Sequence, residues 1–239
     1  MIIEQISDKK VKIVLSEEIC IKDNLKINKI SSLIRENFSD CINVIIAYSS
    51  ALFEFRTPID TKQLKIYLDA IDMDNISLED IIVVTEIPVC YDEMFALDKN
   101  YVEEYTGLSF DEIVQIHTQR YYYIYFIGFL PGFPYLGGLD KRIHIPRKRD
   151  PRVLVPSGSV GIGGMQTGIY PLDSPGGWQI IGRTPLKLFD INRKDPFLLK
   201  SGEGICFKVI DVKEYAAIEK NNMYMPNRFK ISIKEVFND

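Results

Sequence analysis

Apolar positions in the first 85 residues follow two alternating spacings. Short β-branched runs predict strands at residues 11–15, 42–47, 52–55 and 81–88. Apolar side chains three and four positions apart predict helices at residues 23–37 and 60–71, the first capped by Asp23. The order β-α-β-β-α-β is the split βαβ or ferredoxin-like pattern of a small α+β domain, which we place at residues 1–87. Many unrelated functions share this scaffold, so it predicts little chemistry.

After residue 87, short strands separated by glycine and proline replace the alternation of strands and long helices. Ser109 and Glu112 have the spacing of a capping box, which predicts the start of a helix. The remaining elements are a helix at 214–220 and strands at 121–126, 186–190, 205–210 and 229–233. Many short strands and few helices favour a β-barrel or sandwich-like domain at residues 88–239.

Residues 155–185 hold eight of the chain's 15 glycines and its only tryptophan, Trp178. Such density is typical of positive φ angles, or of backbone that closely approaches a ligand or another strand. Apolar residues between the glycines distinguish the segment from a flexible linker. We interpret it as a tightly turned β segment that walls a pocket. The alternative is a barrel whose tight corners require glycine.

Several side chains in and before this segment are candidates for contact with a ligand. The polar candidates between the glycines are Gln166, Thr167, Tyr170, Arg183 and Thr184. Prolines and glycines at residues 128–138 exclude helix and predict a rigid turned loop. Its aromatic residues, Phe129, Phe133 and Tyr135, either stand at a pocket rim or fill the core.

A basic run follows this loop, with six cations and His144 between positions 141 and 152. Such a run is usually a solvated face. Pro146 and Pro151 stiffen this one, however. Arg149 and Arg152 are therefore candidates for holding a carboxylate or phosphate group.

His117 falls on the apolar stripe of the predicted helix, in line with Phe110 and Ile113. A histidine in this position is more often a satisfied core or helix-end group than a catalytic one. The alternative is that this face lines a cleft, where His117 acts as a hydrogen-bond donor or general base.

Composition narrows the class of protein. The hydrophobic content of 46% and charged content of 26% are ordinary for a globular protein. No apolar run reaches the roughly 18 residues of a membrane span, and the first residues lack the order of a signal peptide, so we expect a cytoplasmic protein. The net charge of −4 argues against nucleic acid as a partner. The scattered cysteines, expected to be reduced thiols, are Cys20, Cys41, Cys90 and Cys206.

Familiar catalytic motifs are absent from the sequence. It contains no GxxxxGK[ST], GxGxxG, GxSxG or HExxH pattern, and only two histidines. We therefore expect no metal site. The residues alone predict a pocket with polar and cationic groups but no recognisable nucleophile. This describes either a binding subunit or half of an active site shared with a partner.

Four stretches resemble one family in particular. GFLPGFPYLGGLD, PRKRDPRVLVPSGSVGIGG, QTGIYPLDSPGGWQIIGRTP and the LFD at 188–190 are similar to the family of 5-oxoprolinase B subunits. That family also includes a sporulation-kinase inhibitor and proteins labelled allophanate hydrolase subunit 1. The resemblance extends from about residue 88 to 210. It implies a cyclophilin-like β-barrel after the small α+β domain.

The resemblance also implies a function. It points to the B subunit of an ATP-dependent 5-oxoprolinase that, with a homologous C subunit and an A subunit, converts 5-oxo-L-proline to L-glutamate. The protein is expected to be inactive alone, with ATP and Mg²⁺ bound mainly by the partner. One alternative is an inhibitor that blocks autophosphorylation of a sporulation-type histidine kinase. Another is a carboxyltransferase-like partner in urea or allophanate metabolism.

Matching the family's motifs position by position implies a set of site residues. The implied catalytic residues are His117, Gln166 and Arg183. The implied substrate-binding residues are Phe133, Arg149, Arg152, Tyr170, Gly176, Gly177, Trp178 and Thr184. The sequence departs from the family at residues 92–98, where a glycine-rich turn and a Gly-Pro-Asp element are usual.

Overall fold

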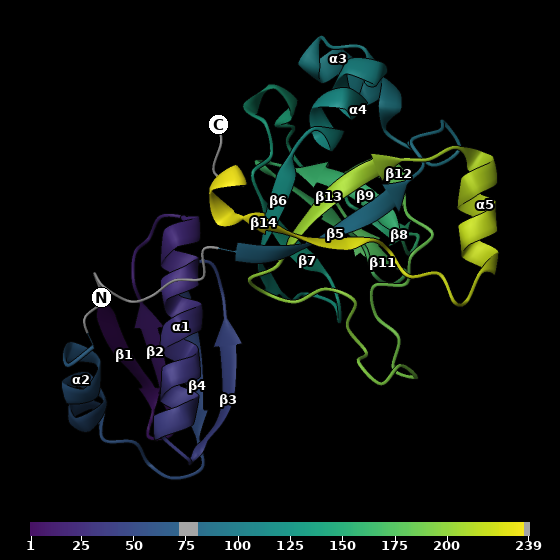
Figure 1. Cartoon of the computed structure of the whole chain (residues 1–239). Coiled ribbons are helices and arrows are strands. Elements are labelled where there is room, and N and C mark those ends of the chain that lie inside the picture. The colour runs from purple at the N-terminus through teal and green to yellow at the C-terminus, as the bar shows by residue number, and fades with distance from the viewer. Residues whose placement is uncertain (72–80, 237–239) are drawn as a thin grey trace. The chain divides into compact units, whose positions relative to one another are not determined.

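The computed structural model describes residues 1–71 and 81–236. The chain divides into two compact units, Met1–Glu79 and Asp80–Asp239, coloured from purple to yellow along the chain in Figure 1. Each unit has its own hydrophobic core, so each is described by itself.

The first unit is a four-stranded antiparallel sheet with two helices. The strands are β1 (Ile2–Ser7), β2 (Lys10–Val14), β3 (Cys41–Ile46) and β4 (Ser50–Phe55), in the order β1-β2-β4-β3. Helix α1 (Ile21–Asn37) packs on β3 and β4, and α2 (Thr61–Asp69) packs near β1. Apolar side chains of α1 at Ile27, Ile30 and Ile34 are fully buried, as the spacing predicts.

The helices and inner strands of this unit agree with the sequence prediction, with two differences. Asp23 does not cap α1, because the N-cap position is Cys20 and the Asp23 carboxylate instead accepts a hydrogen bond from Ser16 Oγ at 2.8 Å. Strand β1 was not predicted, because five of its six residues are exposed and its sequence shows no buried face. An edge strand of this kind carries little periodic signal.

Strand β5 (Ile81–Val89) was predicted as the last strand of the first domain, and this placement is wrong. It pairs in parallel with β13 (Gly204–Val209) and antiparallel with β14 (Arg228–Ser232), both in the second unit. The β-α-β-β-α-β pattern therefore lacks its final strand. A strand's own residues show that it is buried, but they do not show which neighbour it pairs with.

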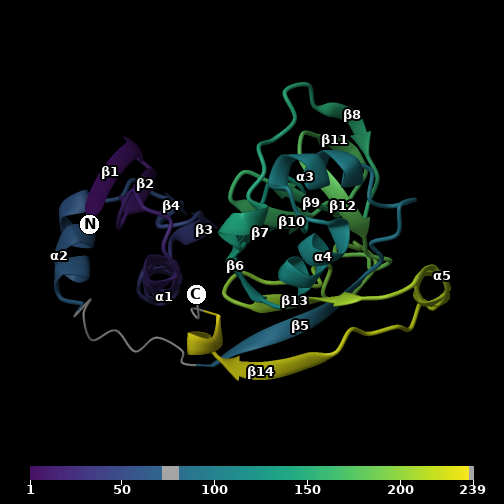
Figure 2. The same cartoon turned by 90° about the horizontal axis from the view of Figure 1, so that it is seen from above.

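Two sheets and a strand pair build the second unit (Figure 2). The larger sheet has the order β14-β5-β13-β6-β7, where β6 is Tyr121–Ile127 and β7 is Pro134–Gly137. The other sheet has the order β10-β9-β12, with β9 at Ser159–Gly163, β10 at Gln166–Ile169 and β12 at Gln179–Arg183. Strands β8 (Arg152–Val155) and β11 (Ser174–Gly176) form the separate pair.

The predicted closed barrel is not present among the described residues, whose sheets are open. The two larger sheets still enclose one core, which includes Ile124, Ile162 and Ile205. The edge strand β7 packs beside β10, and a bridge joins Cys90, directly after β5, to Arg183 in β12. A register shift between Ile180 and Gly182 in β12 interrupts regular pairing. Such bulges bend a strand and disrupt the ladder locally.

The described residues of this unit also form three α-helices, namely α3 (Lys99–Thr106), α4 (Phe110–Thr118) and α5 (Val212–Lys220). Figure 1 shows α3 and α4 together over one end of the strands, where α4 packs on β13. The predicted capping box is present: Ser109 Oγ accepts from Glu112 N–H, and the Glu112 carboxylate accepts from Ser109 N–H. The Ser109 hydroxyl also donates to the Glu112 carboxylate at 2.6 Å, and this bond, followed by the one from Ser109 N–H, lowers the pKa of Glu112.

Other predictions for the second unit have mixed outcomes. The strands at 121–126, 205–210 and 229–233 and the helix at 214–220 are confirmed to within two residues at each end. The strand at 186–190 is wrong, because only one isolated bridge, between Phe189 and Phe197, forms there. Helix α3 was not predicted. Cys20, Cys41, Cys90 and Cys206 are free thiols. Among the described residues, none of the helices has the length and apolar character needed to span a bilayer.

Candidate functional site

A hollow of about 200 Å³ opens in the second unit beside the glycine-rich segment. It lies where the loop after β6, the basic loop before β8, and the end of β11 meet. The residues that line it are Phe129, Phe133, Tyr135, Arg147, Lys148, Pro151, Tyr170, Gly176, Gly177 and Trp178. Five of the predicted substrate-binding residues are therefore brought together: Phe133, Tyr170, Gly176, Gly177 and Trp178.

Aromatic rings form the floor of this pocket. Phe133 is buried, and its ring meets Tyr170 and Trp178 edge-on, each at a centroid distance of 5.5 Å. Tyr135 packs against Phe133 at 5.1 Å and stacks on Phe126 at 4.3 Å. Edge-to-face pairs of this kind add to the stability gained from burial alone. The floor is therefore a packed cluster of rings whose apolar carbon lines the pocket.

The glycines of this segment allow the tryptophan to pack against backbone. A Cβ atom at Gly163 would lie 2.6 Å from Trp178 Cδ1, and one at Gly168 would lie 2.8 Å from its Cζ3. Real Cβ atoms do not approach other heavy atoms so closely, so only glycine fits beneath the indole. The segment therefore fits the interpretation as a pocket wall: Gly163 and Gly168 admit close packing of Trp178, and Gly176 and Gly177 line the pocket.

Phe129 stands at the pocket mouth in a strained backbone conformation. Its φ angle is +64°, and it is the one non-glycine residue with positive φ in the described part of the chain. A hydrogen bond of 2.7 Å from Leu130 N–H to Gly128 O closes a three-residue turn around it. Its ring is 66% exposed and meets Phe133 at 5.7 Å. Strain retained at a pocket is typical of functional positions.

This strain leads to a prediction that compares two substitutions at one position. Phe129→Ala and Phe129→Gly both remove the ring, but only glycine adopts positive φ without steric cost. We expect the Gly variant to be more stable than the Ala variant by about 1 kcal/mol, although glycine is ordinarily the less stable choice. Urea unfolding of both variants measures the difference. An Ala variant that equals or exceeds the Gly variant contradicts the strained turn.

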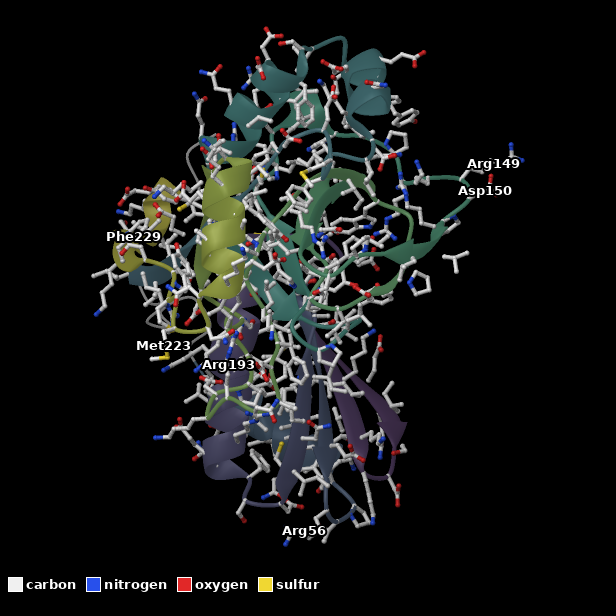
Figure 3. The ribbon with its side chains drawn as sticks, turned by 90° about the vertical axis from the view of Figure 1, so that its right-hand side faces the viewer. Arg56, Arg149, Asp150, Arg193, Met223 and Phe229 are labelled. Carbon is white, nitrogen blue, oxygen red and sulfur yellow. The ribbon has the colours of Figure 1, made fainter. Side chains whose placement is uncertain are left out.

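The cations at the pocket are not the ones that the sequence selected. The Arg147 guanidinium lies over the Trp178 ring at 5.6 Å, and its side chain is otherwise exposed. Lys148 also lines the pocket. Arg149 projects from the tip of the loop into solvent (Figure 3). The prolines 146 and 151 predicted a stiff loop, but they did not indicate which of its cations faces inward.

Arg152 is held by Asp98 and does not reach the pocket lining. Its guanidinium donates two hydrogen bonds, of 2.8 and 2.7 Å, to the Asp98 carboxylate, which also accepts from Lys148 Nζ at 2.8 Å and from Ile180 N–H at 2.6 Å. Burial opposes ionisation of Asp98, but the hydrogen bonds from Arg152, Lys148 and Ile180 outweigh it and lower the pKa of the carboxyl. Asp98 lies in the stretch 92–98 and was not predicted as a site residue.

His117 is fully buried in the core, away from the pocket lining. Its Nδ1 lies 2.9 Å from Tyr91 Oη and its Nε2 lies 2.8 Å from Thr167 Oγ1. Its ring stacks on Phe207 at 4.3 Å. Burial lowers the pKa of His117 to about 3. Of the two alternatives for this residue, the arrangement fits a satisfied core group.

Gln166, Arg183 and Thr184 also lie outside the pocket lining. Arg183 Nε donates to Ser157 O at 2.8 Å, and the guanidinium lies over Phe95 at 5.9 Å. Thr184 is buried, and its backbone N–H donates to Gly158 O at 2.9 Å. Gln166 pairs with Gly163 across the turn between β9 and β10. The pocket therefore contains none of the three residues predicted to be catalytic.

Comparison with known proteins identifies the class to which this fold and pocket belong. A family model described as the carboxyltransferase domain, subdomain C and D, matches residues 1–199, and the chain belongs to this family. Within it, the chain is 48% identical over 139 residues to the B subunit of 5-oxoprolinase from Bacillus subtilis (strain 168), covering 58% of each protein. The resemblance predicted from the sequence is thereby confirmed. The chain's match spans just over half the length of the curated relatives.

Solved structures agree with this family. The chain superposes on TTHA0988 with a TM-score of 0.74 and 30% identity, covering 85% of this chain and 40% of that one. It superposes on the K. lactis urea amidolyase with a TM-score of 0.77, covering 98% of this chain and 16% of that enzyme. The identity to the amidolyase is 20%, so this second likeness concerns the fold alone. The mixed α+β fold is that of carboxyltransferase-like domains.

Proposed function

We propose that this chain is the B subunit of an ATP-dependent 5-oxoprolinase, which converts 5-oxo-L-proline to L-glutamate together with a homologous C subunit and an A subunit. Three relatives that are 48–52% identical to this chain over the matched residues are named as B subunits of 5-oxoprolinase, which supports this proposal. The observation that carries it is the small aromatic pocket with a guanidinium at its mouth. The protein is inactive alone, and its predicted cyclophilin-like character is part of the same proposal.

The pocket suits the chemistry of this substrate. 5-Oxoproline is a single five-membered lactam ring that carries one carboxylate. Phe133, Tyr135 and Trp178 line the pocket with aromatic carbon against which the ring can pack. The Arg147 guanidinium offers a planar pair of donors to the carboxylate. Burial raises the pKa of the Tyr170 hydroxyl, which therefore stays protonated and able to donate to the lactam oxygen.

ATP would make the lactam reactive. Transfer of the terminal phosphoryl group of ATP to the lactam oxygen releases ADP and makes the ring carbon electrophilic. Water attacks this carbon, and the C–N bond breaks as the nitrogen takes up a proton, which leaves an acyl phosphate. A second water hydrolyses the acyl phosphate to the side-chain carboxylate of glutamate and inorganic phosphate. The pocket volume of about 200 Å³ is below the roughly 300–1,000 Å³ typical of pockets for drug-sized ligands. A single ring fits this volume better than a nucleotide. ATP and its Mg²⁺ are therefore proposed to bind mainly on the partner proteins.

The test is reconstitution with the A and C subunits, followed by measurement of glutamate released from 5-oxo-L-proline. We expect release that requires ATP and all three proteins. Arg147→Ala is expected to raise KM for 5-oxo-L-proline about tenfold, because it removes a charge-assisted hydrogen bond. Its kcat should change little, since the carboxylate is bound alike in ground and transition states.

Arg149→Ala is the matched control for this substitution. It removes the same charge from the same loop, but its side chain projects into solvent at the tip of the loop (Figure 3) and does not line the pocket. We expect Arg149→Ala to keep the KM and kcat of the wild type. Equal rises in KM for the two variants would mean that only the net charge of the loop matters. A complete mixture that releases no glutamate contradicts the proposed function.

A carboxyltransferase-type reaction on urea is the second candidate, favoured by the family model and by the fold shared with urea amidolyase. To test this candidate, urea, bicarbonate and a biotin-carrier protein are added to the same mixture. ATP consumption that depends on urea would distinguish the carboxyltransferase reaction from 5-oxoprolinase activity. The alternative of a histidine-kinase inhibitor stays a prediction from the sequence. Inhibition of kinase autophosphorylation by the isolated chain tests it.

A further inference from the structure

We propose that Asp98 is a positioning residue for the pocket, one that holds the basic loop and the Trp178 backbone in register so that Arg147 remains the cation at the mouth. This inference rests on the proposed function for its kinetic test, although its structural test does not. Asp98 touches none of the space that a ligand occupies, and it acts through the residues bonded to it.

The first observation is the set of donors that converge on one buried carboxylate. The Asp98 side chain is 4% exposed, while the two cations bonded to it, Lys148 and Arg152, are 27% and 23% exposed. Arg152 contributes a two-pronged guanidinium contact, which fixes orientation as well as charge. A buried charge is tolerated only when it is paired and fully hydrogen-bonded, and Asp98 meets this condition.

The second observation is what Asp98 does not do. It occupies the N-cap position of α3, where an aspartate usually accepts a hydrogen bond from the first turn of its helix. Here the side chain makes no such bond. Its oxygens are used instead by Lys148, Arg152 and Ile180, which lie 50 to 82 positions away along the chain. The carboxylate is therefore directed toward the pocket wall rather than toward its own helix.

The third observation is that the bonds of Asp98 reach both sides of Trp178. Asp98 and Ile180 are joined twice: Ile180 N–H donates to the Asp98 carboxylate, and the backbone N–H of Asp98 donates to Ile180 O at 2.9 Å. On the other side, Lys148 N–H donates to Gly177 O at 2.6 Å. Gly177 immediately precedes Trp178, so the loop and the pocket wall move together.

The charges at the site decide which role Asp98 has. Arg147, Lys148, Arg152 and Asp98 together carry a net charge of +2, which Asp98→Asn raises to +3. If Asp98 acted only through charge, its removal would tighten binding of an anionic substrate. If it acts by positioning, binding weakens although the site has become more positive. The direction of the change in KM therefore separates the two roles.

The kinetic test uses Asp98→Asn in the reconstituted three-protein enzyme. We expect KM for 5-oxo-L-proline to rise about tenfold with kcat nearly unchanged. An unchanged or lower KM in the folded variant overturns the proposal. Arg152→Lys removes the two-pronged contact but keeps the charge of the site, so a rise in KM in this variant cannot come from charge, and we expect KM to rise in the same direction. It decides between the two roles where Asp98→Asn does not fold, and a KM of the wild type in Arg152→Lys then overturns the proposal.

The structural test uses the isolated chain and needs no substrate. Trp178 is the only tryptophan, so its emission reports on the pocket alone. We expect a shift of the emission maximum in Asp98→Asn and Arg152→Lys, and faster hydrogen exchange at the Lys148 amide. Unchanged emission and exchange overturn the proposal even where the enzyme is active. A wild-type mixture that releases no glutamate overturns the proposed function and leaves these two measurements valid.

Asp140→Asn is the matched control for a general loss of stability. Asp140 is also a buried carboxylate that holds two cations, Arg120 at 3.1 Å and Arg142 at 2.8 Å, but none of these residues lines the pocket. We expect Asp140→Asn to lower stability while keeping the Trp178 emission and the KM of the wild type. Equal shifts in the Asp98 and Asp140 variants would assign both effects to loosened packing and overturn the positioning role.

Discussion

Replacing Gly158 with alanine is expected to lower the free energy of unfolding of the second unit by about 3 kcal/mol or more. Two separate causes add. The φ angle of Gly158 is +81°, a conformation that alanine adopts only with strain. In addition, a Cβ atom there would collide with the carbonyl oxygen of Thr184, which is backbone and not a flexible side chain. Thr184 N–H donates to Gly158 O, so neither residue can move without loss of this hydrogen bond.

The loss of stability is measured by urea unfolding followed through Trp178 emission. Gly164→Ala is the matched control, because Gly164 lies in the same segment, has a φ angle of +68°, and has no atom within 4 Å of the added Cβ. Its cost should be the strain alone, about 1–2 kcal/mol. The difference between the variants isolates the collision. Equal losses of unfolding free energy in the two variants would show that the backbone near Thr184 shifts without an energetic penalty.

The same substitution is expected to disturb the pocket. Gly158 N–H donates to Tyr170 O at 2.7 Å, and the Tyr170 ring lines the pocket beside Trp178. A backbone shift at Gly158 is therefore transmitted to the aromatic floor. A Gly158 variant that folds at low temperature should show a higher KM for 5-oxo-L-proline, whereas Gly164→Ala should not.

The local elements of this fold could be predicted because their signals lie within each segment. The spacing that buries Ile27, Ile30 and Ile34 identifies α1, and Ser109 with Glu112 identifies the start of α4. Pairing between distant strands carries no such signal. Strand β5 reads equally well as the end of the first unit or as a central strand of the second. Only its bonds to β13 and β14 decide this.

The aromatic half of the pocket could be predicted for a similar reason. Phe133, Gly176, Gly177 and Trp178 lie in short segments whose own residues fix their shape. The cationic half could not. Six cations lie between residues 141 and 152, and two of them, Lys148 and Arg152, are bonded to Asp98, which lies 50 and 54 positions earlier. The signal that was missed is an aspartate at an apparent N-cap whose preferred partners lie in a distant basic loop.

His117 is a predicted catalytic residue for which the structure favours another role. Thr167 Oγ1 donates its proton to Gly161 O at 3.1 Å, so it accepts from His117 Nε2–H, and Nδ1 is left to accept from the Tyr91 hydroxyl. The hydrogen bonds therefore assign a neutral imidazole with its proton on Nε2. Protonation would place a second proton on Nδ1, in conflict with the Tyr91 donor, inside a fully buried site.

The fold should therefore lose stability in mild acid through this one group. Burial lowers the pKa of His117 from 6.5 to about 3, so between these values the unfolded chain binds a proton that the folded chain does not. Unfolding then takes up a proton, and stability falls as pH falls through this window. The contribution is fully present above pH 6.5. At pH 5 the free energy of unfolding is lower by about 2 kcal/mol through this group than it is above pH 6.5.

The non-titrating variant His117→Gln isolates this effect. We expect it to be less stable than the wild type at pH 8, where the imidazole is neutral in both states, because Tyr91 and Thr167 lose well-placed partners. As the pH falls to 5, the gap between wild type and variant should narrow by about 2 kcal/mol, because only the wild type loses stability through His117. Urea unfolding at intervals between pH 8 and pH 5 measures the gap. A gap that stays constant across this range would mean that His117 can be protonated within the fold, and the general-base role would then regain its support.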